Sequence, residues 1–331
     1  MLIRQLINGW LMLLIPLFIL PPHVTAATFD PAASDETAWR PPKATHLFIG
    51  GGFSTGIYYA VATLLCHQLN AARQESGIRC GVGMTGGSLD NRERLQRGLL
   101  QFGLMQSDIA EESAADGVLQ GVVKLHDEMI YMALAERWRD TPLADLPWDQ
   151  IQIGVVGSGS FVTANRLLTL FGIESTRAED GTYRALQKMS TRELEQKMGP
   201  DQLDGFFLTT GKNSTIIKEI LQQHPDYHLR SLPAITGQKA YRPATIAANS
   251  YPNQPQPIDS YTVYAMLVTR ADVPAWVIET LLERLFSDLK PLQQVHKALT
   301  DLTPESMAIP LPLPLHPAAA QYFRQQGWLI P

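Results

Sequence analysis

Five short turns carry the residues of this chain that are best placed to bind a ligand. Three of them precede amphipathic segments that start near Thr55, Ser88 and Ser160. A helix start presents free backbone N–H groups and the positive end of the helix dipole, and glycine lets an anion come close. Glycine also closes ordinary strand-to-helix turns, but five such turns flanked by hydroxyl or amide residues favour ligand binding. The turns are Gly50–Gly56, Thr85–Ser88, Gln106–Asp108, Gly157–Ser160 and Thr209–Ser214.

Motifs of catalysis are missing from the sequence. Gly50–Gly56 lacks the spacing of a dinucleotide fingerprint, and no phosphate-binding loop or Gly-x-Ser-x-Gly nucleophile elbow occurs. His224 and His228 are four residues apart, but Pro225 between them prevents a shared helical face. Two cysteines and scattered histidines are too few for a metal site. We therefore expect no catalytic residue, no metal and no cofactor, and a protein that is not an enzyme.

The first three turns follow strands of a βαβαβ pattern. The apolar periodicity predicts strands at 46–49, 78–84 and 102–106, with helices at 57–70 and 88–99 between them. Ser88 is expected to be the N-cap of the second helix. Asp108 ends the third strand at the expected cleft, where a capping role and ligand contact are equally good interpretations. The pattern predicts a mostly parallel sheet with helices on its faces.

A second set of elements follows a less clear section at 118–150. Strands are predicted at 151–156 and 205–209, with helices at 160–171 and from Ser214 or Thr215 to His224. Residues 242–257 hold many prolines and are expected to form a loop. A β-rich run at 260–269 and helices at 273–289 and 317–326 complete the chain. Two such units predict an α/β fold with two lobes, in which all five turns face one cleft.

The N-terminus has the features of a signal peptide. Arg4 precedes an apolar run that Pro16 interrupts, and small residues end at Ala26. A retained membrane anchor is the other interpretation, but the run is shorter than the ~20 residues that span a bilayer. We expect residues 1–26 to be cleaved and residues 27–43 to be an unstructured leader. The net charge of −5 and the lack of a basic block exclude a nucleic-acid partner.

The two cysteines, Cys66 and Cys80, lie close together in the sequence. Export to an oxidising compartment makes a disulfide between them plausible, because the predicted helix and strand that carry them are neighbours in one βαβ unit. Two separate buried thiols are the other interpretation.

The order of these motifs resembles the TAXI solute receptors of tripartite ATP-independent periplasmic (TRAP) transporters. The most specific element is Thr85–Ser88 with Asn91, followed by Gln106–Asp108. The resemblance covers roughly residues 46–329 and rests on these segments: IGGGFSTGIYYAVATLLCHQLN, GIRCGVGMTGGSLDN, FGLMQSDIA, GVVGSGSFVTANRLLTLFGI, DGFFLTTGKNSTIIKEIL, SYTVYAMLVTRADVP and PLHPAAAQYFRQQGWL.

The resemblance implies a two-lobed periplasmic-binding-protein fold of the type II kind, with mixed sheets, helices on both faces and a central ligand cleft. Lobe 1 would comprise residues 44–130 and 260–331, and lobe 2 residues 131–259. The protein would be periplasmic and soluble and would hand a small organic acid or amino acid, such as glutamate or a dicarboxylate, to a TRAP-type permease. The residues that the resemblance places at the ligand are Ser54, Thr55, Tyr58, Thr85, Gly87, Ser88, Gln106, Ser107, Asp108, Gly157, Ser158 and Gly159.

Two other functions fit the same cleft. A periplasmic receptor could present its bound solute to a membrane sensor, and a permease or a histidine kinase encoded beside it would separate these roles. A periplasmic hydrolase is disfavoured, because no nucleophile–base pair or metal cluster can be assembled from the sequence.

Overall fold

A computed structural model describes residues 44–173, 194, 198 and 203–328 of the chain. The described residues all belong to one compact unit. The predicted signal peptide (1–26) and leader (27–43) lie outside the described residues. Among the described residues, no helix combines the length and apolarity needed to cross a membrane.

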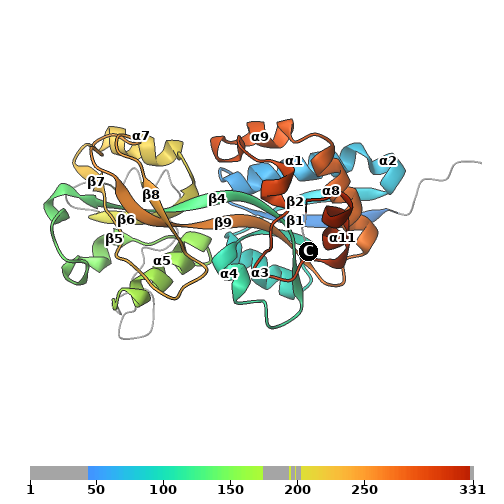
Figure 1. Ribbon diagram of the computed structural model, residues 1–331, viewed down its shortest axis with the longest axis horizontal. Helices are drawn as coiled ribbons and strands as arrows, with labels where there is room; N and C mark the ends of the chain where they lie inside the picture. Colours follow the sequence, from blue (N-terminus) through green and yellow to red (C-terminus); the bar gives the residue numbers. More distant parts are fainter. Residues whose placement is uncertain (1–43, 174–193, 195–197, 199–202, 329–331) are drawn as a thin grey trace, which may run out of the picture. The chain divides into compact units, whose positions relative to one another are not determined.

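One mixed sheet of nine strands organises the described part of the chain (Figure 1). Its main path runs β2-β1-β3-β9-β4-β6-β5, while β7 pairs with β4 and β8 with β9. Strands β1, β2 and β3 are mutually parallel, as the βαβαβ pattern predicts. The strands are β1 (Thr45–Gly52), β2 (Ile78–Met84), β3 (Phe102–Gln106), β4 (Leu119–Ala135), β5 (Ile151–Gln152), β6 (Gly205–Gly211), β7 (Tyr227–Leu229), β8 (Arg242–Ile246) and β9 (Ile258–Arg270).

Two long antiparallel strands, β4 and β9, run through both halves of this sheet (Figure 1). Near one end β9 pairs with β3, and near the other end β4 pairs with β6 and β7. The register between β4 and β9 shifts between Gly121 and Val123 and again between Lys124 and Asp127. The section 118–150, whose elements were unclear from the sequence, therefore contains β4, a strand shared by two lobes.

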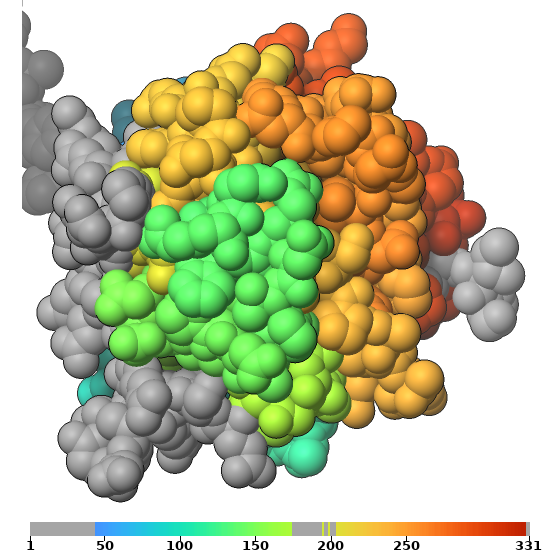
Figure 2. Space-filling model, turned by 90° about the vertical axis from the view of Figure 1, so that its left-hand side faces the viewer, coloured from blue at the N-terminus to red at the C-terminus, as the bar shows by residue number. Residues whose placement is uncertain are grey.

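Helices cover both faces of the sheet in each lobe (Figure 1). They are α1 (Ile57–Ala71), α2 (Arg73–Ser76), α3 (Ser88–Gln96), α4 (Ser107–Glu111), α5 (Gly159–Leu170), α7 (Thr215–Gln223), α8 (Ala275–Ser287), α9 (Lys290–Val295), α10 (Pro304–Met307) and α11 (Pro317–Gln325), with 3-10 turns η1 (Glu136–Trp138), η2 (Leu143–Asp145), η3 (Trp148–Gln150) and η4 (Lys297–Leu299). Figure 2 looks onto the lobe that holds β5–β8, and the green segments near residues 130–150 occupy the middle of this face, with yellow segments above them and orange segments to their right.

The apolar core follows the alternation of the two shared strands. In the first lobe, Leu267 of β9 packs with α1, α8, α9 and α11, while its neighbour Met266 packs with α3 and α4 on the other face. In the second lobe, Met132 of β4 packs with α5, and its neighbour Tyr131 packs with α7. Successive side chains of a strand point to opposite faces, so an unbroken apolar run indicates a sheet buried on both sides. This is the predicted α/β architecture with helices on both faces.

The structure corrects three local predictions. Ser88 is the first residue of α3 rather than its N-cap, which is Gly87; its hydroxyl instead accepts a hydrogen bond from the backbone N–H of Gln106. The predicted strand at 151–156 ends at Gln152, because Gly154 has a φ of +112° that leaves the extended region.

The third correction is β8, which lies in the segment expected to be a loop. It pairs with β9 along Arg242–Ile246 despite Pro243. β8 pairs with no other strand of the described sheet. An edge strand tolerates proline because the N–H that proline lacks would face away from the partner.

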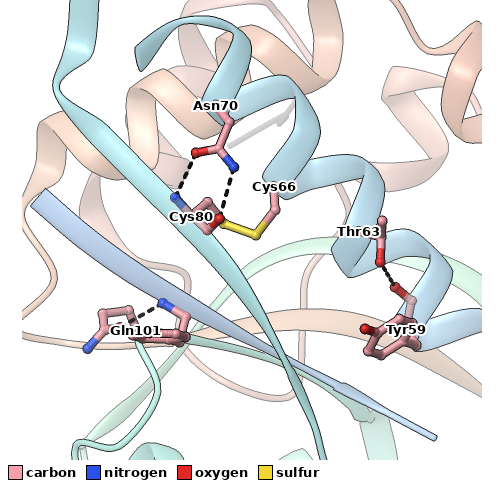
Figure 3. The surroundings of a disulfide bond; sticks show 7 residues. Tyr59, Thr63, Cys66, Asn70, Cys80 and Gln101 are labelled. Atoms are coloured by element: carbon pink, nitrogen blue, oxygen red, sulfur yellow. Dashed lines mark hydrogen bonds between the residues drawn. A yellow bond between two sulfur atoms is a disulfide. The ribbon is translucent and has the colours of Figure 1, made fainter. Parts of the chain in front are cut away.

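The disulfide between Cys66 and Cys80 is confirmed (Figure 3). It joins α1 to β2, the helix and strand that follow each other in the first βαβ unit. Asn70, one helical turn after Cys66, donates to the carbonyl of Cys80 (2.9 Å) and accepts from its N–H (2.9 Å). The covalent link and the two hydrogen bonds fix α1 on the edge strand of the sheet.

Candidate ligand-binding cleft

A cavity of about 380 Å³ opens between the lobes, at the size expected for a small-molecule site. The predicted ligand residues that line it are Ser54, Thr55, Tyr58, Gly87, Ser88, Gln106, Ser158 and Gly159. The other lining residues are Gly51, Gly52, Phe53, Gly56, Ile57, Gly86, Glu128, Gln152, Gly154, Val155, Ser160, Leu194, Phe207, Leu208, Thr209, Thr210 and Ile216.

The strand directions explain why turns from both lobes meet here. β3 is antiparallel to β9, β9 to β4 and β4 to β6, so β6 and its parallel neighbour β5 run opposite to β1, β2 and β3. The carboxyl ends of the strands in each lobe therefore point towards the other lobe. Ligands of open α/β sheets bind beyond such ends.

Glycine allows the two walls to touch. A Cβ atom added to Gly159 would lie 1.7 Å from Oε1 of Gln106 and 2.9 Å from Oγ of Ser88, both in the other lobe. Gly87 has a φ of +111° and lies against the backbone of Ser158. The N–H of Asp90 donates to the carbonyl of Gly157 (3.4 Å), which links α3 to the second lobe.

The three helix starts differ in what they offer an anion. At α3 the carboxylate of Asp90 accepts from the N–H of Gly86 (2.8 Å) and holds Arg94 (2.7 Å), so this helix start carries its own anion. Partial burial is the largest single effect on the pKa of Asp90 and acts to raise it. The hydrogen bonds from Arg94 and Gly86 together outweigh burial, so the pKa is lowered. The first turns of α1 and α5 hold no acidic residue. Their starts remain the better places for a ligand carboxylate.

One carboxylate, that of Glu128 in β4, faces the cavity. Its side chain is 6% exposed, and the hydroxyl of Tyr58 donates to its Oε2 (3.3 Å). Nε2 of His126 lies 3.5 Å from its Oε1. Burial, followed by the charge of Glu128, raises the pKa of Tyr58 well above its ordinary value, so the hydroxyl keeps its proton. Among the described residues that line the cavity, none is lysine, arginine or histidine.

Two buried glutamine side chains also line the cavity, those of Gln106 and Gln152. Each is 3% exposed, and neither Oε1 atom has a hydrogen-bond partner among the described residues. A buried acceptor without a partner costs roughly 1–3 kcal/mol. A ligand with hydrogen-bond donors would remove that cost.

Four predicted ligand residues lie outside the cavity lining. The hydroxyl of Thr85 accepts from the N–H groups of Gly52 (2.9 Å) and Gly87 (3.3 Å) and so shapes two lining turns. The hydroxyl of Ser107 accepts from the N–H of Tyr264 (3.1 Å). Gly157 has a φ of +93° in the turn before α5.

The fourth, Asp108, joins the lobes. Its buried carboxylate accepts from the hydroxyls of Thr163 (2.7 Å) and Tyr241 (3.1 Å), both of the second lobe. Arg166 lies 3.6 Å from the same oxygen and donates to the Asp108 carbonyl (2.9 Å). Burial raises the pKa of Asp108, while Arg166, Thr163 and Tyr241 act to lower it.

Sequence reasoning missed Glu128 and Gln152, and took Thr209 and Thr210 only as part of a turn. Glu128 directly precedes the apolar run from Met129 to Ala135. A carboxylate next to an apolar strand is the sequence signal that could have marked Glu128 as a site residue. Asn91, singled out with Thr85–Ser88, ties α3 to the sheet by donating to the carbonyls of Gly50 (3.2 Å) and Leu104 (2.7 Å). Within the described ranges, no cluster of three potential metal ligands occurs.

Two lobes joined by crossing strands, with a cavity between them, define the class of two-lobed ligand-binding proteins. More particularly, the chain belongs to the NMT1-like family, whose sequence model matches residues 49–327.

Several solved structures are similar in fold. XAC2383 from Xanthomonas citri, solved with ATP, is 15% identical with a TM-score of 0.48, covering 85% of this chain and 95% of that one. The GluR0 ligand-binding core with L-glutamate is 10% identical with a TM-score of 0.44, covering 77% and 99%. A variant of the OxyR2 regulatory domain from Vibrio vulnificus is 13% identical with a TM-score of 0.37, covering 73% and 96%. These values are too low to assign a ligand to this chain.

Proposed function

We propose that this protein is an extracytoplasmic receptor of the TAXI type, which captures a small carboxylated solute in its interlobe cavity and delivers it to a TRAP-type permease. The observation that carries the proposal is the pair of helix starts, α1 and α5, which enter one cavity from opposite lobes without an acidic residue of their own. A carboxylate between them would accept hydrogen bonds from both lobes and hold the lobes together.

The lining suits binding without chemical conversion. Among the described residues that line the cavity, the polar groups are hydroxyls, amides and backbone groups around the carboxylate of Glu128. Hydrogen bonds from neutral donors to a charged group are roughly twice as strong as those between neutral groups, so a buried carboxylate needs no arginine. The solute would leave the site unchanged.

Thermal unfolding with a panel of solutes tests the proposal. The panel pairs carboxylates with their primary amides, for example glutarate with glutaramide, on the purified full chain. A carboxylated ligand at 100 times its Kd stabilises the folded protein by about 2.7 kcal/mol, and its amide should give a much smaller shift. Calorimetry would then measure Kd for each pair that responds. The absence of a shift with every carboxylate, or equal shifts with the amides, would contradict the proposal.

A further inference from the structure

We propose that Glu128 forms a subsite for an ammonium group, so that the ligand is a zwitterion with an amine as well as a carboxylate. This inference rests on the proposed function and narrows it, because a dicarboxylate without an amine is no longer a candidate. The reason is the position of the Glu128 carboxylate, which lines the cavity and is almost fully buried there.

The protein leaves this carboxylate poorly compensated. A buried charge is costly unless it is paired and hydrogen-bonded. Tyr58 contributes one neutral donor at 3.3 Å. The two nearby lysines of the described chain, Lys124 and Lys212, are bound to the adjacent residue Asp127 at 3.0 and 2.9 Å.

His126 is the other group that could carry a compensating charge. Its Nε2 atom lies 3.5 Å from Glu128, just at the limit of a hydrogen bond, and its ring nitrogens have no hydrogen-bond partner among the described residues. A cationic His126 would satisfy Glu128 without any ligand. The protein would then have no preference for an amine, which makes the two cases separable by experiment.

A second observation points to the same kind of ligand. The Oε1 atoms of Gln106 and Gln152 are buried acceptors without a partner in the described part of the chain, and both side chains line the cavity. An ammonium group brings three hydrogen-bond donors and no acceptor, which matches a wall that holds one carboxylate and two amide oxygens. A second carboxylate there would face the negative charge of Glu128.

Tyr58 connects the two ends of the proposed site. It lies in the first turn of α1, where the ligand carboxylate is expected, and its hydroxyl binds Glu128. A ligand with its carboxylate at the helix start and its amine at Glu128 would lie along this side chain. The two charges of the ligand then meet different groups, the N–H groups of the helix start and the Glu128 carboxylate.

The test compares ligands that differ only in the amine: L-glutamate with glutarate, 4-aminobutyrate with butyrate, and L-leucine with 4-methylpentanoate. Thermal unfolding of the full chain identifies responsive pairs, and calorimetry measures their Kd. For the wild type we expect the amine member to bind about 10- to 100-fold more tightly. Glu128→Gln keeps an acceptor for the Tyr58 hydroxyl. It should weaken binding of the ligand with the amine by a similar factor and leave the Kd of the ligand without the amine unchanged.

Glu305→Gln is the matched control, because it makes the same change from carboxylate to amide at an exposed residue outside the cavity lining. It should leave the preference for the amine unchanged, and circular dichroism should show both variants folded. If the wild type binds the acid without an amine as tightly as its amine-bearing partner, or more tightly, the ammonium subsite is wrong and the receptor proposal still stands. If no member of any pair binds, the carboxylate receptor itself is wrong and the subsite falls with it.

Discussion

At the scale of single residues, two positions control how the lobes meet. Gly159 allows α5 to start against Gln106 and Ser88, and Asp108 places a buried carboxylate against hydroxyls of the opposite lobe. One contact borders the cavity and the other lies outside its lining. They can therefore be tested separately, the first by affinity and the second by stability.

Gly159→Ala should weaken ligand binding by at least about 10-fold. Its added Cβ atom would lie 1.7 Å from Oε1 of Gln106, so the Gln106 side chain, which lines the cavity, must leave its position or the lobes must separate. Each outcome disturbs contacts between the ligand and the cavity wall. A loss of about 1.4 kcal/mol of binding free energy raises Kd tenfold. Calorimetry with a ligand of the wild type measures the loss.

Gly83→Ala is the control for this substitution. A Cβ atom there would meet its nearest neighbour at an ordinary 3.7 Å, in a strand outside the cavity lining. It should bind normally. Unchanged affinity in folded Gly159→Ala would show that the ligand does not need the observed contact between the walls.

Asp108→Asn should alter how stability depends on pH. Burial raises the pKa of Asp108 in the folded protein, so between the ordinary and the raised pKa the folded state binds more protons than the unfolded state. The free energy of unfolding of the wild type, relative to Asp108→Asn, should therefore rise as pH falls through the folded pKa. Denaturant unfolding of both proteins between pH 7 and pH 4 measures this difference.

The groups that face Asp108 are Arg166, Tyr241 and Thr163, and Arg166 also pairs with Glu112. Burial also raises the pKa of Tyr241, with Asp108 as the next cause, so this hydroxyl stays protonated throughout the range. If the free energy of unfolding of the wild type, relative to Asp108→Asn, falls with decreasing pH, then Arg166 and the hydroxyls lower the pKa of Asp108 by more than burial raises it.

At the scale of elements, α1 and α5 are held in place in different ways. Its start borders the cavity, and its later turns are joined to β2 by the disulfide and by Asn70. α5 depends instead on its N-cap, where the hydroxyl of Ser158 accepts from the N–H of Phe161 (3.2 Å). The two helix starts proposed for the carboxylate are thus fixed by different means.

Removing the disulfide should destabilise the protein by about 3 kcal/mol. The 14-residue separation of Cys66 and Cys80 closes a short loop, and its loss gives the unfolded chain more conformational entropy. Denaturant unfolding of Cys66→Ala/Cys80→Ala beside the oxidised wild type measures the change. A reducing agent should lower the stability of the wild type alone, and a thiol assay on the denatured, unreduced protein should find no free thiol.

At the scale of the whole molecule, the lobes share strands rather than a flexible linker. β4 and β9 cross together, and their register is irregular at Gly121–Val123 and Lys124–Asp127. Irregular pairing locally bends and twists strands. The second irregularity ends beside Glu128, so the proposed ammonium subsite lies next to a bend in the shared strands.

The proposed role outside the cytoplasm predicts a processed chain that begins near Ala27. The basis is the short apolar run with Pro16, followed by small residues up to Ala26. Intact mass of the protein released by osmotic shock from a host that exports it measures the first residue. Full-length chain in the membrane fraction would contradict both the cleavage and the proposed location.

The local pattern of the sequence determined most of the elements and the turns between them. The strands 78–84 and 102–106 were predicted at their observed bounds, and α1, α5, α7 and α11 within a few residues. Periodicity and glycine suffice here because each element buries its own apolar face. The helix starts expected near Thr55 and Ser160 follow from the same local signals, and the structure has them at Ile57 and Gly159.

Only the tertiary structure decided which groups share the cavity. Glu128 and Gln152 lie in strands, and no local sequence pattern marks their side chains as cavity-lining. They share the cavity with Tyr58 because β4 crosses between the lobes. Asp108 lies outside the cavity lining because α5 and Tyr241 cover it from the other lobe. Pairing between distant strands sets these contacts, and no sequence pattern within a single element encodes which strands pair.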